Sequence, residues 1–199
     1  MKKIAFLLCI CSFSANAQTD SLKAREEIVA FQKKLNDEYK NRGESPLDAN
    51  AFATFKGHDY FPINLAYRVV AKLEVTPSTP FFSMKTTSSR FSTERIYGYV
   101  HFTLVGKEFR LPVYQSKDLM QTAEYADYLF FPFADLTSGS ETYPAGRYLD
   151  LDLTRTGIYL VDFNRAYNPY CYYNPTYDCP YPPRSNRLQV PIRAGEKVK

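Results

Sequence analysis

The spacing of apolar residues changes along the chain, from a helical period near the N-terminus to a period of two further on. Between Ser21 and Gly43, apolar side chains recur on one helical face. Glutamates early in this segment and basic residues late in it suit the helix dipole, and Pro46 follows as a stop signal. The pattern predicts a helix within residues 18–44 whose buried stripe packs on a sheet; the stripe is Ala24, Ile28, Phe31, Leu35 and Tyr39.

From residue 64 onward, short apolar segments of period two are separated by turn residues. In the segment 147–153, three leucines alternate with Tyr148, Asp150 and Asp152, which is typical of half-buried antiparallel strands. In the segment 95–105, the even-numbered residues from Ile96 to Leu104 form one face. The pattern predicts eight strands, at 66–75, 80–86, 95–105, 107–114, 128–133, 147–153, 157–163 and 188–192.

Eight strands and one helix predict a mainly β protein. The expected architecture is an antiparallel β-sandwich or a partly open barrel with one N-terminal packing helix. The sequence shows no domain linker and no convincing long repeat, so residues 45–199 are expected to form a single mainly-β domain.

The first 17 residues have the three parts of a secretory signal peptide. Lys2 and Lys3 precede an apolar run of ten residues, and Ala15-Asn16-Ala17 forms a small-x-small cleavage site. The run is well short of the roughly 20 residues that cross a bilayer. We therefore expect cleavage after Ala17, a periplasmic or secreted protein, and no membrane span in the mature chain.

Cleavage changes both the charge and the cysteine count. The formal net charge of +4 falls to +2 when Lys2 and Lys3 leave, which gives no reason to expect nucleic acid as a partner. Of four cysteines, Cys171 and Cys179 remain. In an oxidising compartment the first reading of such a pair is a disulfide, with free buried thiols or a chemical role as alternatives.

Sequence signatures of the common catalytic and cofactor sites are absent. No Gly-rich phosphate loop or G-x-S-x-G elbow occurs, and the two histidines, His58 and His101, have no second ligand at metal spacing. The sequence therefore predicts no metal and no cofactor.

Polar residues gather in the last third of the chain, around a tyrosine- and proline-rich loop at 164–187. Asp162 lies on the apolar face of its strand, so it needs a partner, and Arg147 or Arg187 can supply one. Asp162 or Glu196 with Arg147 are candidate catalytic residues. Candidate binding residues are Asp135, Thr142, Tyr143, Arg147, Asn164, Tyr167, Asn168, Asn186 and Arg187. The alternative is that these residues only hold loops in place.

The same residues carry a resemblance. The segments FPFADLTSGSETYPAGRYLDL, DFNRAYNPYC, CPYPP, NRL and AGEK resemble, in order and spacing, the bacterial and archaeal family "domain of unknown function 1684", over about residues 45–197. Tyr172 and Tyr181 depart from the family pattern and make the loop more aromatic. The resemblance implies no activity. Positions matching the motif are Asp135, Thr142, Tyr143, Gly146, Arg147, Asp162, Asn164, Tyr167, Asn168, Cys171, Cys179, Asn186 and Glu196.

Three functional hypotheses follow. The first is a pocket for a small molecule or glycan, formed by the tyrosine-rich C-terminal third, in which sugar rings stack on exposed tyrosines. The second is a metal-independent hydrolase or lyase that uses Asp162 or Glu196 as base and Arg147 as electrostatic stabiliser. The third is a structural cell-envelope protein without a pocket, in which the tyrosines pack inward.

Overall fold

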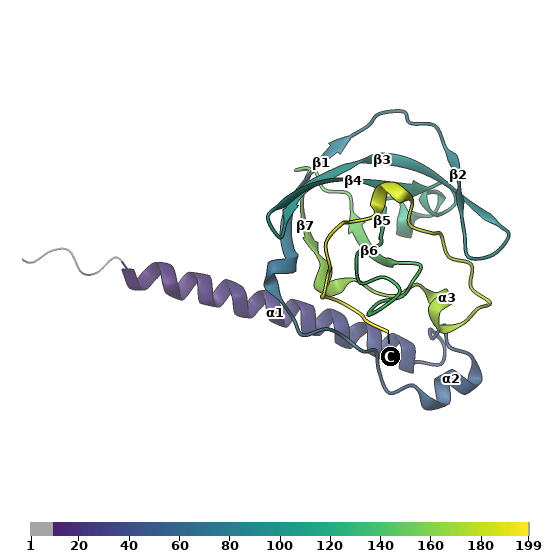
Figure 1. Cartoon of the computed structure of the whole chain (residues 1–199), viewed down its shortest axis with the longest axis horizontal. Coiled ribbons are helices and arrows are strands. Elements are labelled where there is room, and N and C mark those ends of the chain that lie inside the picture. The colour runs from purple at the N-terminus through teal and green to yellow at the C-terminus, as the bar shows by residue number, and fades with distance from the viewer. Residues whose placement is uncertain (1–9, 199) are drawn as a thin grey trace, which may run out of the picture.

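Seven strands form one antiparallel sheet that curves into a nearly closed barrel (Figure 1). The computed structural model of the protein describes residues 10–198. The mainly β prediction is confirmed, and of the two architectures the barrel is the one found. The strands are β1 (Arg68–Val75), β2 (Phe82–Lys85), β3 (Phe91–Leu104), β4 (Lys107–Ser116), β5 (Tyr128–Phe133), β6 (Arg147–Asp152) and β7 (Ile158–Asp162).

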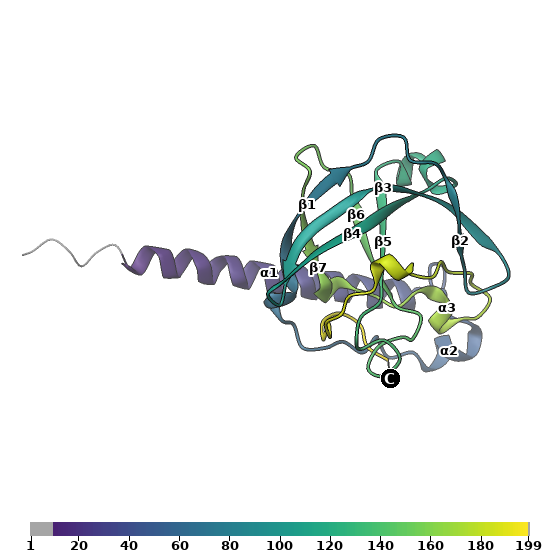
Figure 2. The ribbon, with the colours of Figure 1, turned by 45° about the horizontal axis from the view of Figure 1, so that its top comes forward.

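Three α-helices accompany the barrel: α1 (Ile10–Lys40), α2 (Ala49–Thr54) and the short α3 (Tyr170–Tyr173). Helix α1 runs along the outside of the barrel, and its N-terminal part extends beyond it (Figures 1 and 2). Ile28 and Tyr39 are buried, which confirms the predicted stripe. The helix begins earlier than expected, so the predicted cleavage site after Ala17 lies within it, and residues 1–9 of the expected signal peptide lie outside the described residues. Within residues 10–198, no helix is both long and apolar enough to cross a membrane.

The barrel is open between its first and last strands. The strand order is β6-β5-β4-β3-β1-β7, with β2 paired to β3, and no ladder joins β6 to β7 among the described residues. Helix α1 covers this opening. Phe31 of α1 lies beside Leu149 of β6 and Leu160 of β7, around a cavity of only ≈ 40 Å³.

The inside of the barrel is a packed apolar core. Leu149 and Leu151 of β6 belong to it, together with side chains such as Val100, Phe131 and Phe163. A second buried cluster lies on the outer face and contains Tyr114, Phe130, Tyr148 and Cys179. The predicted alternation along β6 is therefore confirmed, with leucines inside and Tyr148 outside.

A bulge in β3 breaks the predicted single face of that strand. Ile96 pairs with Tyr114 and Gly98 pairs with Val113, so β3 holds one extra residue. Val100, Phe102 and Leu104 point into the core, whereas Ile96 packs with the outer cluster. The prediction was wrong at Ile96 because a period of two carries no signal for an inserted residue.

The predicted eighth strand at 188–192 is not formed. Leu188, Val190 and Ile192 are buried, as the alternation required. Their backbone makes isolated bonds instead of a ladder, for example from Leu188 N to Ala134 O at 2.8 Å, and Pro191 has no N–H to give. Residues 187–198 form a C-terminal strap along the end of the barrel.

Candidate functional site

Arg147, a candidate catalytic residue, is completely buried and paired. Its Nη2 donates to Asp135 Oδ2 at 3.0 Å and to Ile192 O at 2.8 Å. Its Nη1 donates to the carbonyl oxygens of Ala194 and Glu196. Burial lowers the pKa of Arg147, and Asp135 opposes that effect. The guanidinium therefore ties the strap to the barrel and has no room for a ligand.

The partners of Arg147 are themselves hydrogen-bonded. Asp135 Oδ1 accepts from Thr137 N at 2.8 Å, from Thr137 Oγ1 at 2.6 Å and from Ile192 N at 3.1 Å. Thr137 Oγ1 lies 2.9 Å from Thr142 Oγ1. Asp135, Thr137, Thr142 and Arg147 are called the Arg147 cluster below. Its geometry is that of a buried ion pair in which both terminal nitrogens of Arg147 and both oxygens of Asp135 have partners, while Arg147 Nε has none among the described residues.

Asp162 does not meet Arg147 or Arg187. Its carboxylate pairs with Arg68, whose Nη1 donates to Oδ2 at 2.8 Å, and Arg68 Nη2 donates to Glu27 Oε2 on α1 at 2.6 Å. Asp162 Oδ1 also accepts from the backbone and side-chain nitrogens of Asn164. This network joins α1 to the end of β7. The expected partner of Asp162 was wrong because Arg68 lies 94 residues away in sequence.

Two further predicted residues have clear positions. The side chain of Asn186 is buried and donates to Pro112 O at 2.9 Å and to Pro132 O at 2.8 Å. This amide bridges β4 and β5, which share a single ladder pair. Each strand has a proline there, Pro112 or Pro132, whose backbone cannot donate a hydrogen bond. Arg187 is exposed.

Cys171 and Cys179 are free thiols in the structure, so the predicted disulfide is not formed. They are nonetheless neighbours, since Cys171 N donates to Cys179 Sγ at 3.3 Å. Side-chain hydrogen bonding with the Cys179 thiol lowers the pKa of the Cys171 thiol. Tyr143 OH lies 3.9 Å from Cys171 Sγ.

A large polar cavity lies outside the barrel, between α1 and the outer face of β5 and β6. Its volume is ≈ 560 Å³, and we call it the outer cavity. Phe31 and Leu35 of α1 form one wall, and Tyr170 of the tyrosine-rich loop lies at the edge. Of the predicted binding residues, Tyr167 lines it.

Glu94 of β3 is the most unusual side chain of the outer cavity. It is 2 % exposed, and its Oε2 has no hydrogen-bond partner in the described structure. Burial raises the pKa of Glu94 to about 7, and Asp118 adds to the effect. The Ser92 hydroxyl opposes this rise in the pKa of Glu94, although Ser92 Oγ and Glu94 Oε2 make no hydrogen bond of ordinary geometry in the described structure. A buried, incompletely bonded carboxyl is typical of functional sites.

Asp150 of β6 lies toward the other end of the outer cavity. Three strand spacings separate β6 from β3, about 14 Å between backbones. Tyr128 OH and Tyr167 OH both donate to Asp150 Oδ1, at 2.7 and 2.8 Å. Solvent reaches the Asp150 side chain, but protein surrounds it on most sides, and this burial raises its pKa against the two hydrogen bonds.

The lining of the outer cavity combines aromatic rings with acidic groups. Carboxyl groups outnumber basic side chains by five to two: Glu38, Glu94, Asp118, Asp150 and Asp178 against Lys34 and Arg90. Arg90 Nε donates to Asp178 Oδ2 at 2.7 Å and Lys34 Nζ lies 3.5 Å from Glu38 Oε1, so both basic groups already have acidic partners. The arrangement favours a neutral or cationic ligand over an anion.

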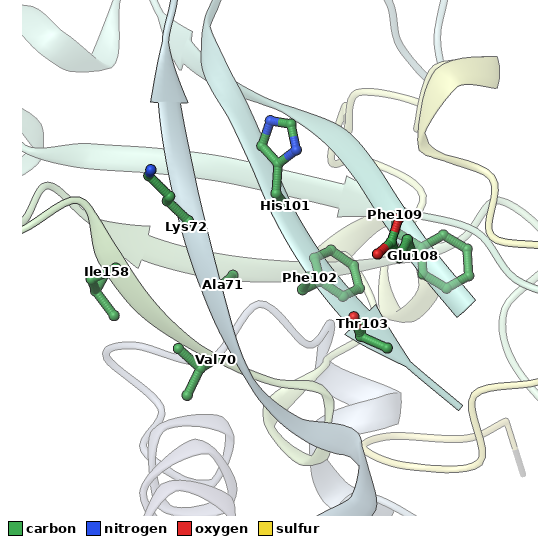
Figure 3. A pocket seen from close by; sticks show the side chains of 9 residues that line it. All are labelled: Val70, Ala71, Lys72, His101, Phe102, Thr103, Glu108, Phe109 and Ile158. Carbon is green, nitrogen blue, oxygen red and sulfur yellow. The ribbon is translucent and has the colours of Figure 1, made fainter. Parts of the chain in front are cut away.

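A hollow of ≈ 380 Å³ on the barrel wall has a different character (Figure 3). It lies where β1 and β3 separate beyond the pair Lys72–His101. Val70, Lys72 and Thr103 on its surface are exposed, and His101 Nε2 already contacts Glu74 Oε2 at 2.6 Å. None of its polar side chains is buried, so it is a weaker candidate than the outer cavity.

The site that the structure favours was only partly predicted. Glu94, Tyr128 and Arg68 were not expected, and Asp150 was placed on an outer face without a role. A signal for Glu94 existed, because it lies two residues before Ile96, on the same strand face. The reasoning that selected Asp162 applies equally to Glu94.

Comparisons with known proteins agree with the motif resemblance. Residues 53–197 match the family described as "Protein of unknown function (DUF1684)". No curated protein matches. The fold is similar to the solution NMR structure of an uncharacterized protein of Haloarcula marismortui, with a TM-score of 0.70 and 29 % identity over 90 % of this chain and 97 % of that one.

The family match covers most of the chain and includes β1 to β7, the tyrosine-rich loop and most of the strap. It begins after α1, so the helical wall of the outer cavity lies outside the matched residues. By this match, the chain belongs to the DUF1684 family of proteins of unknown function.

Proposed function

We propose that this protein is exported and binds a small neutral saccharide in the outer cavity. The observation that carries the proposal is the buried carboxyl of Glu94, a residue that lines the ≈ 560 Å³ cavity and has an oxygen without a partner in the described structure. A hydroxyl of a bound ligand would complete its hydrogen bonding. A cavity of this size falls in the range of small-molecule sites.

The shape and chemistry of the lining support a saccharide among small molecules. Phe31 and Tyr170 offer apolar surface to the C–H faces of sugar rings, while Glu94 and Asp150 accept hydrogen bonds from hydroxyls. The acidic excess disfavours sugar phosphates. The presence of the outer cavity also favours the binding hypothesis over the hypothesis of a structural cell-envelope protein without a pocket.

Export rests on the signal peptide at residues 1–17. Cleavage after Ala17 leaves the helical wall in place, because Phe31, Lys34, Leu35 and Glu38 all follow the cleavage site. Anchoring of α1 through Glu27 and Arg68 is also kept. The proposed mature protein therefore retains a complete outer cavity.

Hydrolysis of the bound saccharide is a second candidate. The specific observation is the raised pKa of Glu94, about 7, which suits a general acid near neutral pH. In this version Glu94 replaces Asp162, Glu196 and Arg147 as the catalytic candidate, because those three do not line the outer cavity. Release of reducing sugar, lost in Glu94→Gln while binding persists, would support it.

Amide chemical shifts of the mature protein, titrated with neutral mono- and disaccharides, test the binding proposal. We expect a saccharide to shift resonances around Tyr128, Asp150 and Tyr167, and the matching sugar phosphates to bind at least tenfold more weakly. Asp150→Asn should weaken binding. The proposal fails if no saccharide shifts these resonances or if the shifts map elsewhere.

A further inference from the structure

A second cavity, separate from the outer cavity, lies beyond α3 and has a volume of ≈ 230 Å³. We call it the small cavity. Tyr170 of α3 lines the outer cavity, whereas Tyr172 and Tyr173 of the same helix line the small cavity. Phe55 and His58, which follow α2, form the opposite side, and Glu196 of the strap also lines it.

Four aromatic rings surround the small cavity at steep angles to one another. The centroids of Phe55 and His58 are 5.0 Å apart with planes at 75°, and those of His58 and Tyr173 are 5.5 Å apart at 89°. Tyr172 and Tyr173 are 4.7 Å apart at 80°. Tyr39 of α1 is buried behind them and contacts Phe55, His58 and Tyr173. The rings therefore form a supported aromatic cage.

Glu196 is a buried carboxyl at this cage. It is 1 % exposed, and its Oε2 accepts from Asn168 N at 2.8 Å. Arg147 Nη1 donates to the backbone carbonyl oxygen of Glu196, and no hydrogen bond from this guanidinium to the Glu196 carboxyl occurs in the described structure. Burial raises the pKa of Glu196 to about 8, against the opposing effects of Asn168 and Arg147.

Neighbouring polar groups are also left unsatisfied. The side-chain amide of Asn168 is fully buried, and neither its nitrogen nor its oxygen makes a hydrogen bond of ordinary geometry in the described structure. The buried hydroxyl of Tyr60, whose backbone pairs with Glu196, also has no partner there. Buried polar groups of this kind, next to a carboxyl that lines a cavity, are typical of a binding site.

We propose that the small cavity binds the methylated ammonium group of a small organic cation, with Phe55, His58, Tyr172 and Tyr173 as the cage and Glu196 as the counter-charge. Aromatic faces attract a cation of low hydration, and a carboxylate stabilises it further. A neutral apolar group would leave Glu196 uncompensated. A metal ion is less suitable, because residues 10–198 contain no group of three His, Cys, Asp or Glu side chains placed to hold one.

The proposal gives a defined pH dependence. The ammonium group binds the ionised form of Glu196, so affinity should rise about tenfold per pH unit below pH 8 and level off above it. Other charged or titratable groups near Glu196 are Arg147, Asp59, Lys197, Tyr39 and Tyr60, together with the cage side chains His58, Tyr172 and Tyr173. Burial raises the pKa values of Tyr39 and Tyr60, so neither ionises in this range.

Titration with choline and with its neutral isostere 3,3-dimethylbutanol, followed by calorimetry and amide chemical shifts at pH 6 to 9, tests the proposal. We expect choline to bind at least tenfold more tightly than the isostere at pH 9 and to shift resonances of Phe55, Tyr172 and Tyr173. Equal affinities, an affinity independent of pH, or shifts that map to the outer cavity would overturn it.

Variants separate the small cavity from the outer cavity. Glu196→Gln should reduce choline affinity at least tenfold, whereas Glu94→Gln, the same change in the outer cavity, should leave choline affinity within twofold. If Glu196→Gln does not fold, Phe55→Leu removes one cage ring at the cavity edge and should weaken choline at least threefold. Unchanged affinity in a folded Glu196→Gln or Phe55→Leu variant contradicts the assignment.

Discussion

The Arg147 cluster and Glu94 of the outer cavity are both buried charged groups, but they differ in how their hydrogen-bonding capacity is used. Asp135 and both terminal nitrogens of Arg147 have partners of ordinary geometry, all from the protein. Glu94 keeps an oxygen without a partner, and its pKa is raised to about 7. The comparison separates charges that hold the fold from charges retained at a cost to stability.

The same contrast runs across one strand. On β6, Leu149 and Leu151 face a filled apolar interior, while Tyr148 and Asp150 face the outer cavity. Because the barrel interior is packed, ligand binding in this account falls to the outer surface, where α1 adds a wall. The period of two in β6 thus separates a structural face from a functional one.

Removing Arg147 should have the largest effect. Arg147→Met leaves the buried Asp135 carboxylate without its counter-charge, and removes the Arg147 donor from Asp135 Oδ2 and from three carbonyls. We therefore expect the free energy of unfolding to fall by about 3–5 kcal/mol. Urea denaturation measures it. The control Arg68→Met breaks a pair nearer the surface and should cost about 1–2 kcal/mol. Equal losses would remove the distinction between the two ion pairs.

A double-mutant cycle sharpens the assignment of partners. Arg147→Met should couple strongly with Asp135→Asn and add independently with Asp162→Asn, because Asp162 pairs with Arg68. Strong coupling between Arg147 and Asp162 would restore the pairing expected from sequence.

Glu94→Gln should raise the free energy of unfolding at pH 8, whereas Arg147→Met lowers it. The folded-state pKa of Glu94, about 7, lies above its unfolded value of 4.5. Its stabilising contribution is present below pH 4.5 and is lost as pH rises through 7. At pH 8 the amide should therefore raise the free energy of unfolding by up to about 3 kcal/mol and flatten its pH dependence between pH 5 and 7. A loss of stability at pH 8 would contradict this account.

Tyr167→Phe should have a smaller effect. It removes one of two hydroxyls that donate to Asp150 Oδ1 and should cost about 1 kcal/mol. It should also raise the pKa of Asp150 further, which carboxyl-carbon NMR can follow. Tyr159→Phe, on the core side, is a control that should leave the Asp150 titration unchanged.

Deletion of residues 1–17 should have the smallest effect. The interactions described between α1 and the barrel involve residues from Arg25 onward. We expect the midpoint of thermal unfolding to change by less than about 2 °C, which corresponds to less than about 1 kcal/mol. Mass spectrometry of the exported protein should give Gln18 as its first residue, and a retained N-terminus would contradict export by cleavage.

The sequence predicted a mainly β fold, with a barrel as one of two architectures, and most strands, because each strand carries its own alternation. It missed the β3 bulge and overcalled a strand at 188–192, since pairing depends on neighbours and not on local pattern. The sequence identified the polar residues in the last third of the chain, but it did not predict which of them hold the fold and which line a cavity. Partners such as Arg68 for Asp162 come from distant segments, and the degree of hydrogen-bond satisfaction that distinguishes Glu94 from Arg147 exists only in three dimensions.

One calorimetric experiment decides whether the saccharide site contains Glu94 or the Arg147 cluster. It measures the affinity of the tightest-binding neutral saccharide for three folded proteins: the native mature protein, Glu94→Gln and Arg147→Lys. We predict at least a tenfold loss of affinity in Glu94→Gln and a change within twofold in Arg147→Lys, when each protein is measured at a temperature at which all three have the same free energy of unfolding. Loss of binding in Arg147→Lys with full binding in Glu94→Gln would place the functional site at the Arg147 cluster and contradict the account.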